Sequence, residues 1–140
     1  MLGKEITPST VAQDLDIYIE QSLTYNEHIT KTAFTCLHKN VQINRIKHLL
    51  DRKTILFLMN SFVSSNLYYC STVWSNTSKH NINKFQLVQN FAARVGLRLK
   101  KFDHISQAIK SLNWLSISDR IYLNDAVMMY KCIINLCPNT

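Results

Sequence analysis

The sequence lacks the features that would place it in several common classes of protein. Glycine and proline number only two each among 140 residues, which is too few for a β-sandwich or barrel with many tight turns. No apolar run approaches the roughly 20 residues that a membrane-spanning helix needs, and the N-terminus has no charged and then apolar signal region. We therefore expect one helix-rich domain, or a piece of one, that is intracellular, in the cytoplasm or nucleus, and is not secreted.

Patterns that carry catalysis or metal binding are missing too. The four cysteines and five histidines form no CxxC, HxxxH or HExxH spacing, whereas a zinc site needs four ligands that converge at short spacings. There is no Asp-Asp or Glu-Glu pair for divalent metals, no GxxxxGK or GxGxxG phosphate loop and no nucleophile elbow. We predict no catalytic residue, no metal ligand and no cofactor, and we interpret the cysteines as buried, reduced thiols.

The distribution of charge is the first positive feature. The net charge is +7, but residues 1–27 carry −4, residues 28–101 carry +11 and residues 102–140 carry zero. Asp51 is the only acid between residues 28 and 101. A concentrated basic field attracts polyanions such as nucleic acid or an anionic membrane surface, and a merely solvated face is an equally open interpretation.

Periodicity predicts a short hairpin followed by two helices. Residues 2–7 and 13–19 are expected as strands joined by the turn TPST, with Asp14 and Asp16 on a solvent-facing edge. A helix is expected over residues 26–48, where one face carries Ile29, Ala33, Leu37 and Val41. Asp51 stands at the N-cap position of a second helix, which is apolar on nearly all sides and is therefore expected at the buried centre of a bundle.

A third long helix is expected over residues 81–100, with two contrasting faces. Its core face carries Phe85, Val88, Ala92, Val95 and Leu99, and its polar face carries Asn83, Gln86, Asn90, Arg94 and Arg98. A shorter helix follows at about residues 104–112, and the last helix begins at the capping-box spacing of Ser116 and Asp119. The predicted fold class is mainly α: a helical bundle of about four to five helices with a short N-terminal β-hairpin.

Two groups of side chains in this bundle have open roles. Tyr68, Tyr69, Trp74 and Trp114 could each stack on a nucleic-acid base, but their apolar neighbours near helix ends favour core positions. Arg94 and Arg98 have no acidic neighbour in the sequence, so a solvated surface and phosphate contact both stay open for them.

The order of four motifs resembles the C-terminal part of the reverse transcriptase encoded by non-LTR (LINE-type) retrotransposons, over nearly the whole chain. The segment AQDLDIYIEQSLTYNEHI has the matching residues Leu23, Tyr25, His28 and Ile29. NLYYCSTVW matches through Tyr69, Val73 and Trp74, and FQLVQNFAAR matches through Gln86, Gln89, Ala93 and Arg94. The last motif, LNWLSISDRIYLNDAVMMYKCIINLCP, matches through Leu112, Trp114, Leu115, Arg120, Tyr130, Lys131 and Pro138.

This resemblance implies a thumb and a segment after it. Residues 1–22 would be a hairpin from the edge of the palm, residues 23–101 a thumb-like helical bundle, and residues 102–140 a truncated post-thumb segment. The thumb of that family holds the RNA template and the growing DNA strand, so the implied partner is an RNA or DNA backbone. The implied contacts come from Gln86, Asn90, Arg94, Arg98, Lys100 and Lys101, and the implied structural anchors are Tyr69, Trp74 and Trp114.

The departures from the family pattern limit what is implied. The palm carboxylates and the fingers are missing, Asp16 stands where the family usually has glycine, and Glu20 stands where it often has aspartate. We therefore expect a truncated or decayed copy that binds nucleic acid and catalyses nothing. Two alternatives stay open: a helical protein-interaction module, whose partner could be the missing palm, and a translated remnant without a function of its own.

Overall fold

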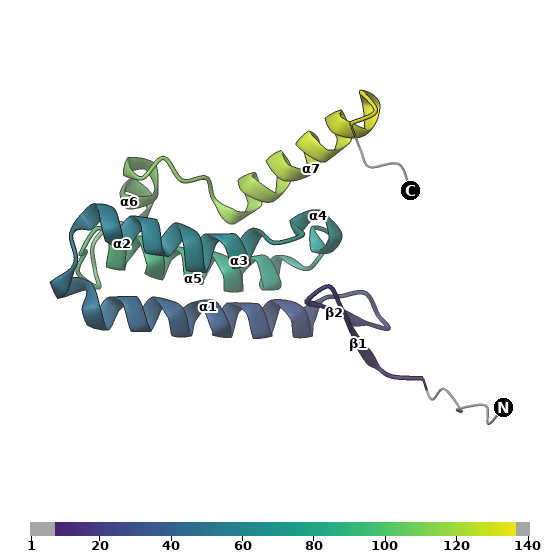
Figure 1. Cartoon of the computed structure of the whole chain (residues 1–140), viewed down its shortest axis with the longest axis horizontal. Coiled ribbons are helices and arrows are strands. Elements are labelled where there is room, and N and C mark those ends of the chain that lie inside the picture. The colour runs from purple at the N-terminus through teal and green to yellow at the C-terminus, as the bar shows by residue number, and fades with distance from the viewer. Residues whose placement is uncertain (1–7, 137–140) are drawn as a thin grey trace.

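The computed structural model describes residues 8–136. Three helical segments, α1, the stretch from α2 to α3, and α5, lie side by side along the long axis of the molecule (Figure 1). The β-hairpin and α4 lie at one end of these segments, α6 lies at the other end, and α7 rises away from the bundle. The elements are β1 (Val11–Asp14), β2 (Ile17–Glu20), α1 (Asn26–Ile46), the 3₁₀ turn η1 (Lys47–Leu49), α2 (Arg52–Met59), the π-helical turn η2 (Asn60–Ser64), α3 (Ser65–Tyr68), α4 (Ser71–Trp74), α5 (Lys79–Gly96), α6 (Ile105–Ser111) and α7 (Ile117–Ile133).

The mainly α fold class with a short β-hairpin is confirmed, but the predicted strand bounds of the hairpin are wrong. β1 and β2 pair antiparallel from Val11 opposite Glu20 to Asp14 opposite Ile17, so the turn lies inside the stretch predicted as one strand. Leu15 and Asp16 have φ values of 45° and 63°, as both central residues of a type I′ turn require. Asp16 is thus a turn residue, not a strand residue on a common face with Asp14. The strand expected at residues 2–7 lies outside the described residues.

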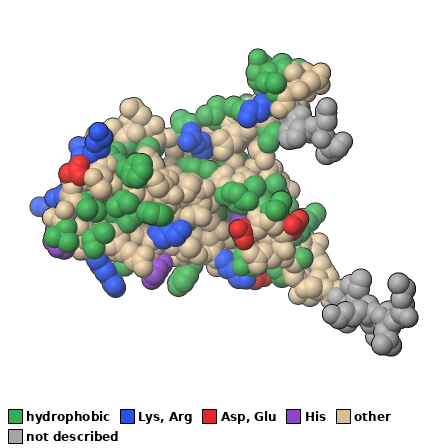
Figure 2. Space-filling model, viewed as in Figure 1, with side chains coloured by type: hydrophobic (Ala, Val, Ile, Leu, Met, Phe, Trp, Pro, Cys, Tyr) green, Lys and Arg blue, Asp and Glu red, His purple; other side chains and the backbone are tan. Residues whose placement is uncertain are grey.

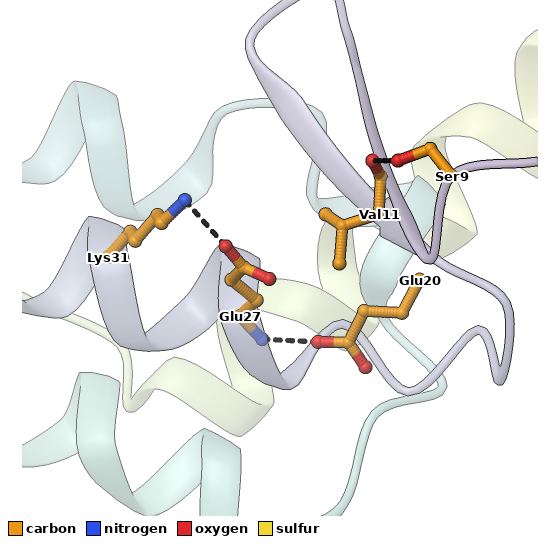
Figure 3. Close-up of polar contacts among 5 residues, drawn as sticks. All are labelled: Ser9, Val11, Glu20, Glu27 and Lys31. Carbon is orange, nitrogen blue, oxygen red and sulfur yellow. Dashed lines mark hydrogen bonds and ion pairs between the residues drawn. The ribbon is translucent and has the colours of Figure 1, made fainter. Parts of the chain in front are cut away.

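Glu20 at the end of β2 caps the start of α1 (Figure 3). The residue before α1, Tyr25, gives no side-chain cap, and the Glu20 carboxylate instead accepts the backbone N–H of Glu27 at 2.5 Å. It also accepts the Thr24 hydroxyl, and this bond, together with the one from Glu27, holds the pKa of Glu20 below its usual value. Glu27 forms an ion pair with Lys31 at 2.6 Å. The hairpin is therefore fixed to the first turn of α1, where a negative charge is favourable.

The helix predicted at residues 26–48 is confirmed as α1, but its buried face differs from the prediction. Leu37 and Val41 are exposed. The face against the bundle alternates between steps of four and three and carries Ile29, Ala33, Cys36, Asn40 and Ile43. Strict steps of four drift by about 40° each around an α-helix of 3.6 residues per turn, so the predicted stripe left the core after two turns.

The segment after Asp51 keeps steps of four because it contains a π-helical turn. The side chains of Ile55, Met59, Val63 and Leu67 are all buried, and η2 lies between the second and the fourth of them. A π-helix has more residues per turn than an α-helix, which compensates for the drift and keeps all four on one side. The prediction that this helix is buried all round is wrong, since Phe57 and Phe62 are 68% and 49% exposed.

Predicted helix caps are confirmed at two places. Asp51 accepts the backbone N–H groups of Lys53 and Thr54 at 3.1 and 3.3 Å at the start of α2. Ser116 accepts the N–H of Asp119 at 3.1 Å, and its hydroxyl donates to the Asp119 carboxylate at 2.7 Å. Such caps satisfy N–H groups that have no partner within the helix. For this reason the start of a helix can be predicted from the sequence.

Candidate nucleic-acid interface

Nine of the 16 lysines and arginines lie at the end of the bundle where α1 ends, α2 begins and α5 ends (Figures 1 and 2). We call this set the basic end; it consists of Arg45, Lys47, Arg52, Lys53, Arg94, Arg98, Lys100, Lys101 and Lys110. Its residues come from two stretches, 45–53 and 94–110, which also hold two acids and thus carry +7, the net charge of the whole chain. The remainder of the chain is neutral overall, so the net positive charge of the protein originates at the basic end.

Arg98 joins the two stretches. α5 ends at Gly96, not at residue 100 as predicted, and Arg98 follows in the left-handed conformation with φ 55°. The N–H of Leu99 bonds to the carbonyl of Arg94 and that of Arg98 to Val95, at 2.9 and 3.2 Å, which is a Schellman ending. The Arg98 guanidinium then donates to the carbonyl oxygens of Lys47 and Leu50 at 2.9 and 2.7 Å.

Arg94 and Arg98 are therefore not two members of one exposed helix stripe. Arg94 donates to the carbonyl oxygen of Lys100 at 2.8 Å, so it holds the loop that presents the next lysines. Both guanidinium groups keep further N–H donors, because arginine has five. Lys100 and Lys101 are exposed in that loop, beyond the end of α5, and no hydrogen bond holds their side chains among residues 8–136.

The two acids at the basic end are occupied by local backbone bonds. Asp51 caps α2, and hydrogen bonds from Thr54, its hydroxyl above all, hold the pKa of Asp51 below the usual value. Asp103 accepts the backbone N–H of Lys100 at 2.7 Å. Within the described part of the chain, none of the nine basic residues is in an ion pair, the single one being Glu27 with Lys31. Their charges are therefore available to an external anion.

The predicted contacts Gln86 and Asn90 lie elsewhere, at the junction of α5 and α7. Gln86 accepts the backbone N–H of Ile117 at 3.0 Å, and its amide donates to Gln89 and Asn90 at 2.8 and 2.9 Å. Gln89, only 4% exposed, donates to the Tyr68 hydroxyl at 3.0 Å and to the Leu115 carbonyl at 2.8 Å. The structure uses these amides to attach α7 to α5, and it does not bring Gln86 or Asn90 together with the basic loop.

The three predicted aromatic anchors differ in their environment. Trp74 is fully buried, donates its indole N–H to the Tyr69 carbonyl at 3.0 Å and meets Phe85 edge-on at 5.1 Å between ring centroids. Trp114 is half-buried and packs against the core. Tyr69 is 45% exposed, so it is not a core side chain, but its hydroxyl donates to Leu15 in the hairpin turn at 3.1 Å.

Several members of the basic end were missed by sequence reasoning. Arg45, Lys47, Arg52, Lys53 and Lys110 were not among the predicted contacts, although the excess charge of residues 28–101 contained four of them. A signal existed in the sequence, since the predicted second and third helices must run in opposite directions if their connection is short. That arrangement places the start of α2 beside the end of α5.

The opposite end of the bundle holds charges of both signs. The hairpin and the start of α1 carry Asp14, Asp16, Glu20 and Glu27, but Lys31 pairs with Glu27, Lys79 begins α5 and Lys84 donates to Thr30 of α1. The excess of positive charge therefore lies at the basic end (Figure 2). Among residues 8–136 no group of three or more histidine, cysteine or acidic side chains could hold a metal ion. No helix in that range is long and apolar enough to cross a membrane. The expectation of buried thiols holds for Cys36 but is wrong for Cys132, which is exposed.

Comparison with protein-family models, with curated proteins and with solved structures found no match.

Proposed function

We propose that this chain is a thumb-like helical unit that binds a nucleic-acid backbone through its basic end and has no catalysis of its own. The supporting observation is the concentration of +7 of charge in two stretches that meet at one end of the bundle, without an ion pair among the described residues there. The parent protein in this proposal is a reverse transcriptase of the non-LTR retrotransposon type, in which the natural ligand is an RNA–DNA hybrid.

The side chains at the basic end suit phosphates better than bases. Seven of the nine are exposed, and Lys47 and Arg94 are half-buried. Lysine and arginine contacts to phosphates are independent of sequence, and each contact releases counterions, so the affinity falls as salt rises. The aromatic anchors do not form a stacking platform at this end, because Trp74 is buried in the core and Trp114 lies near the start of α7. We therefore expect binding that tolerates any sequence and is steeply sensitive to salt.

The test is a salt titration of binding to a labelled RNA–DNA hybrid of arbitrary sequence. The variant Lys100→Gln/Lys101→Gln removes two exposed charges whose side chains make no hydrogen bond or ion pair among the described residues. It should weaken binding at low salt and flatten the slope of log K against log salt by about 2, roughly one for each lost phosphate contact. These lysines give a sharper test than Arg94 and Arg98, because both arginines also hold backbone carbonyls.

The matched control is Lys79→Gln/Lys131→Gln, which removes the same charge from exposed positions outside the basic end. It should leave the slope nearly unchanged. Failure of the wild-type chain to bind the hybrid at low salt would reject the proposed function. Equal loss in the two double variants would instead reject the basic end as the site, since total charge alone would then govern binding.

A further inference from the structure

The outer face of α7 is apolar from Tyr122 onward, and the described residues leave it largely uncovered. Only Ile117 and Ile121, at its start, are buried in the bundle. The Asn124 amide donates to the Ser71 hydroxyl at 2.9 Å. Val127, Met128 and Lys131 line a pocket together with residues of α4, and the C-terminal part of α7 extends away from the other helices (Figure 1). The apolar stripe, as we name this face, consists of Tyr122, Leu123, Ala126, Val127, Met129, Tyr130, Ile133 and Ile134.

The spacing of the stripe is that of a helix that pairs with another helix. Tyr122, Ala126, Met129 and Ile133 follow one another in steps of four, three and four. Leu123, Val127, Tyr130 and Ile134 repeat the same steps beside them. A repeat of seven with two apolar positions forms the seam of coiled coils, and the second row widens that seam. The stripe is therefore organised as an interface and is not a scatter of single exposed residues.

The exposed area is enough for a stable dimer. The exposed fractions run from 41% for Ile134 to 78% for Tyr122. Over the seven large side chains of the stripe they amount to about four whole side chains. At roughly 150 Å² for each, the lower limit for an aromatic side chain, complete burial of the stripe would remove about 600 Å² from one copy and about 1,200 Å² from two. Stable protein interfaces begin at about this size.

Charge separates the possible occupants. Residues 117–136 hold Asp119, Arg120, Asp125 and Lys131, so α7 is neutral and two copies of it do not repel each other. A polyanion gains nothing on a neutral apolar face. The basic end, which would repel its counterpart in a second copy, lies at the other end of the bundle from the direction in which α7 extends (Figure 1). A self-complementary contact with two-fold symmetry is also the commonest way in which soluble chains associate.

We propose that two copies of this chain form a closed dimer through the apolar stripe of α7. The two stripes cover each other, the tyrosine hydroxyls lie at the rim in contact with water, and both basic ends stay outside the contact. This inference does not rest on the proposed nucleic-acid function, because it uses none of the residues of the basic end.

Sedimentation equilibrium of the whole chain tests the dimer at concentrations from about 1 to about 100 µM, where interfaces of this size associate. We expect a monomer–dimer equilibrium. The variant Met129→Glu/Ile133→Glu introduces acids on residues that are 69% and 75% exposed, so its circular dichroism should stay unchanged. Its dissociation constant should rise by at least about a hundredfold, because like charges would face each other in the contact.

The control variant Phe34→Glu/Leu87→Glu makes the same change at residues of α1 and α5 that are 73% and 67% exposed. It should dimerise like the wild-type chain. Three results would overturn the proposal. A wild-type monomer throughout the range would leave the stripe to another protein, and equal loss in both variants would place the contact elsewhere. Assemblies that grow beyond two copies would show a head-to-tail contact, for which the apolar groove lined by Ile43, Ile46, Leu58 and Phe62 is the other candidate surface.

Discussion

Replacing Gln89 by leucine should destabilise the fold although the new side chain is apolar and of similar size. Gln89 is 4% exposed and takes part in three hydrogen bonds, to the Tyr68 hydroxyl, to the Leu115 carbonyl and from the Gln86 amide, with lengths between 2.8 and 3.0 Å. Leucine leaves all three partners without it. A hydrogen bond between neutral groups contributes about 0.5–1.5 kcal/mol. A buried polar group that is left without a hydrogen-bond partner costs more. We expect the free energy of unfolding to fall by about 2–3 kcal/mol after the gain from a buried leucine is deducted.

Urea unfolding followed by tryptophan fluorescence measures this change. Trp114 and Gln89 line the same small cavity, so the probe reports on the junction of α5 and α7. Gln42→Leu is the control, because Gln42 is an exposed residue within α1. It also replaces a helical glutamine by leucine, so the change in helix propensity is the same as in Gln89→Leu. Its effect should stay within about 0.5 kcal/mol. A Gln89→Leu variant as stable as this control would refute the view that the glutamine network attaches α7 to the bundle.

Two buried titratable groups give further predictions. Burial raises the pKa of the Cys36 thiol from 9.0 to about 11, so Cys36 should resist iodoacetamide at pH 8 when folded and react in urea; rapid labelling of the folded chain, read by mass spectrometry, would contradict this. As pH rises, the Cys36 thiol of the unfolded chain loses its proton before that of the folded chain. The free energy of unfolding should therefore fall as pH rises from 9 towards 11. Burial lowers the pKa of His28 from 6.5, so the unfolded chain gains a proton first as pH falls below 6.5, and stability should fall there. The urea midpoint of the wild-type chain should therefore fall as pH falls below 6.5, and that of His28→Gln should not. If the midpoint of the variant falls equally, groups other than His28 cause the pH dependence.

The starts of helices could be predicted from the sequence because the capping interactions that fix them are local. Asp51 and Ser116 cap α2 and α7 as predicted, since a cap needs only one side chain and the N–H groups two or three residues later. The ends of helices were harder to predict. α5, α6 and α7 are followed by Arg98, Asn113 and Asn135 in the left-handed conformation, with the bonding pattern of a Schellman ending. Glycine is the usual signal for that position, and a chain with two glycines offers few such signals.

Side-chain roles that depend on tertiary contact could not be predicted. The π-helical turn at residues 60–64 has no sequence signature, yet it decides which apolar residues of the α2–α3 segment are buried. Gln86 read as a surface contact because its partner, the N–H of Ile117, is 31 residues away. The hairpin turn at Leu15 and Asp16 was hidden because leucine is an unusual residue for a positive φ. Asp16 tolerates that conformation, and the glycine usual at this point in the resembling family would adopt it freely.

The placement of charge and apolar surface favours two separate uses of one small bundle. The excess of bases lies at one end of the bundle and charges of both signs lie at the hairpin end, so a polyanion would attract the basic end first, which orients the chain before contact. α7 begins at the α5 junction and extends away from the basic end (Figure 1), so a partner on the apolar stripe leaves the phosphate-binding residues accessible. The helix α5 connects both features, because Gln86 and Gln89 hold the segment where α7 starts and Arg94, close to the end of α5 at Gly96, holds the basic loop. Side chains of one helix thus hold both surfaces: the glutamines hold the point from which the apolar helix leaves the bundle, and Arg94 holds the loop that carries Lys100 and Lys101.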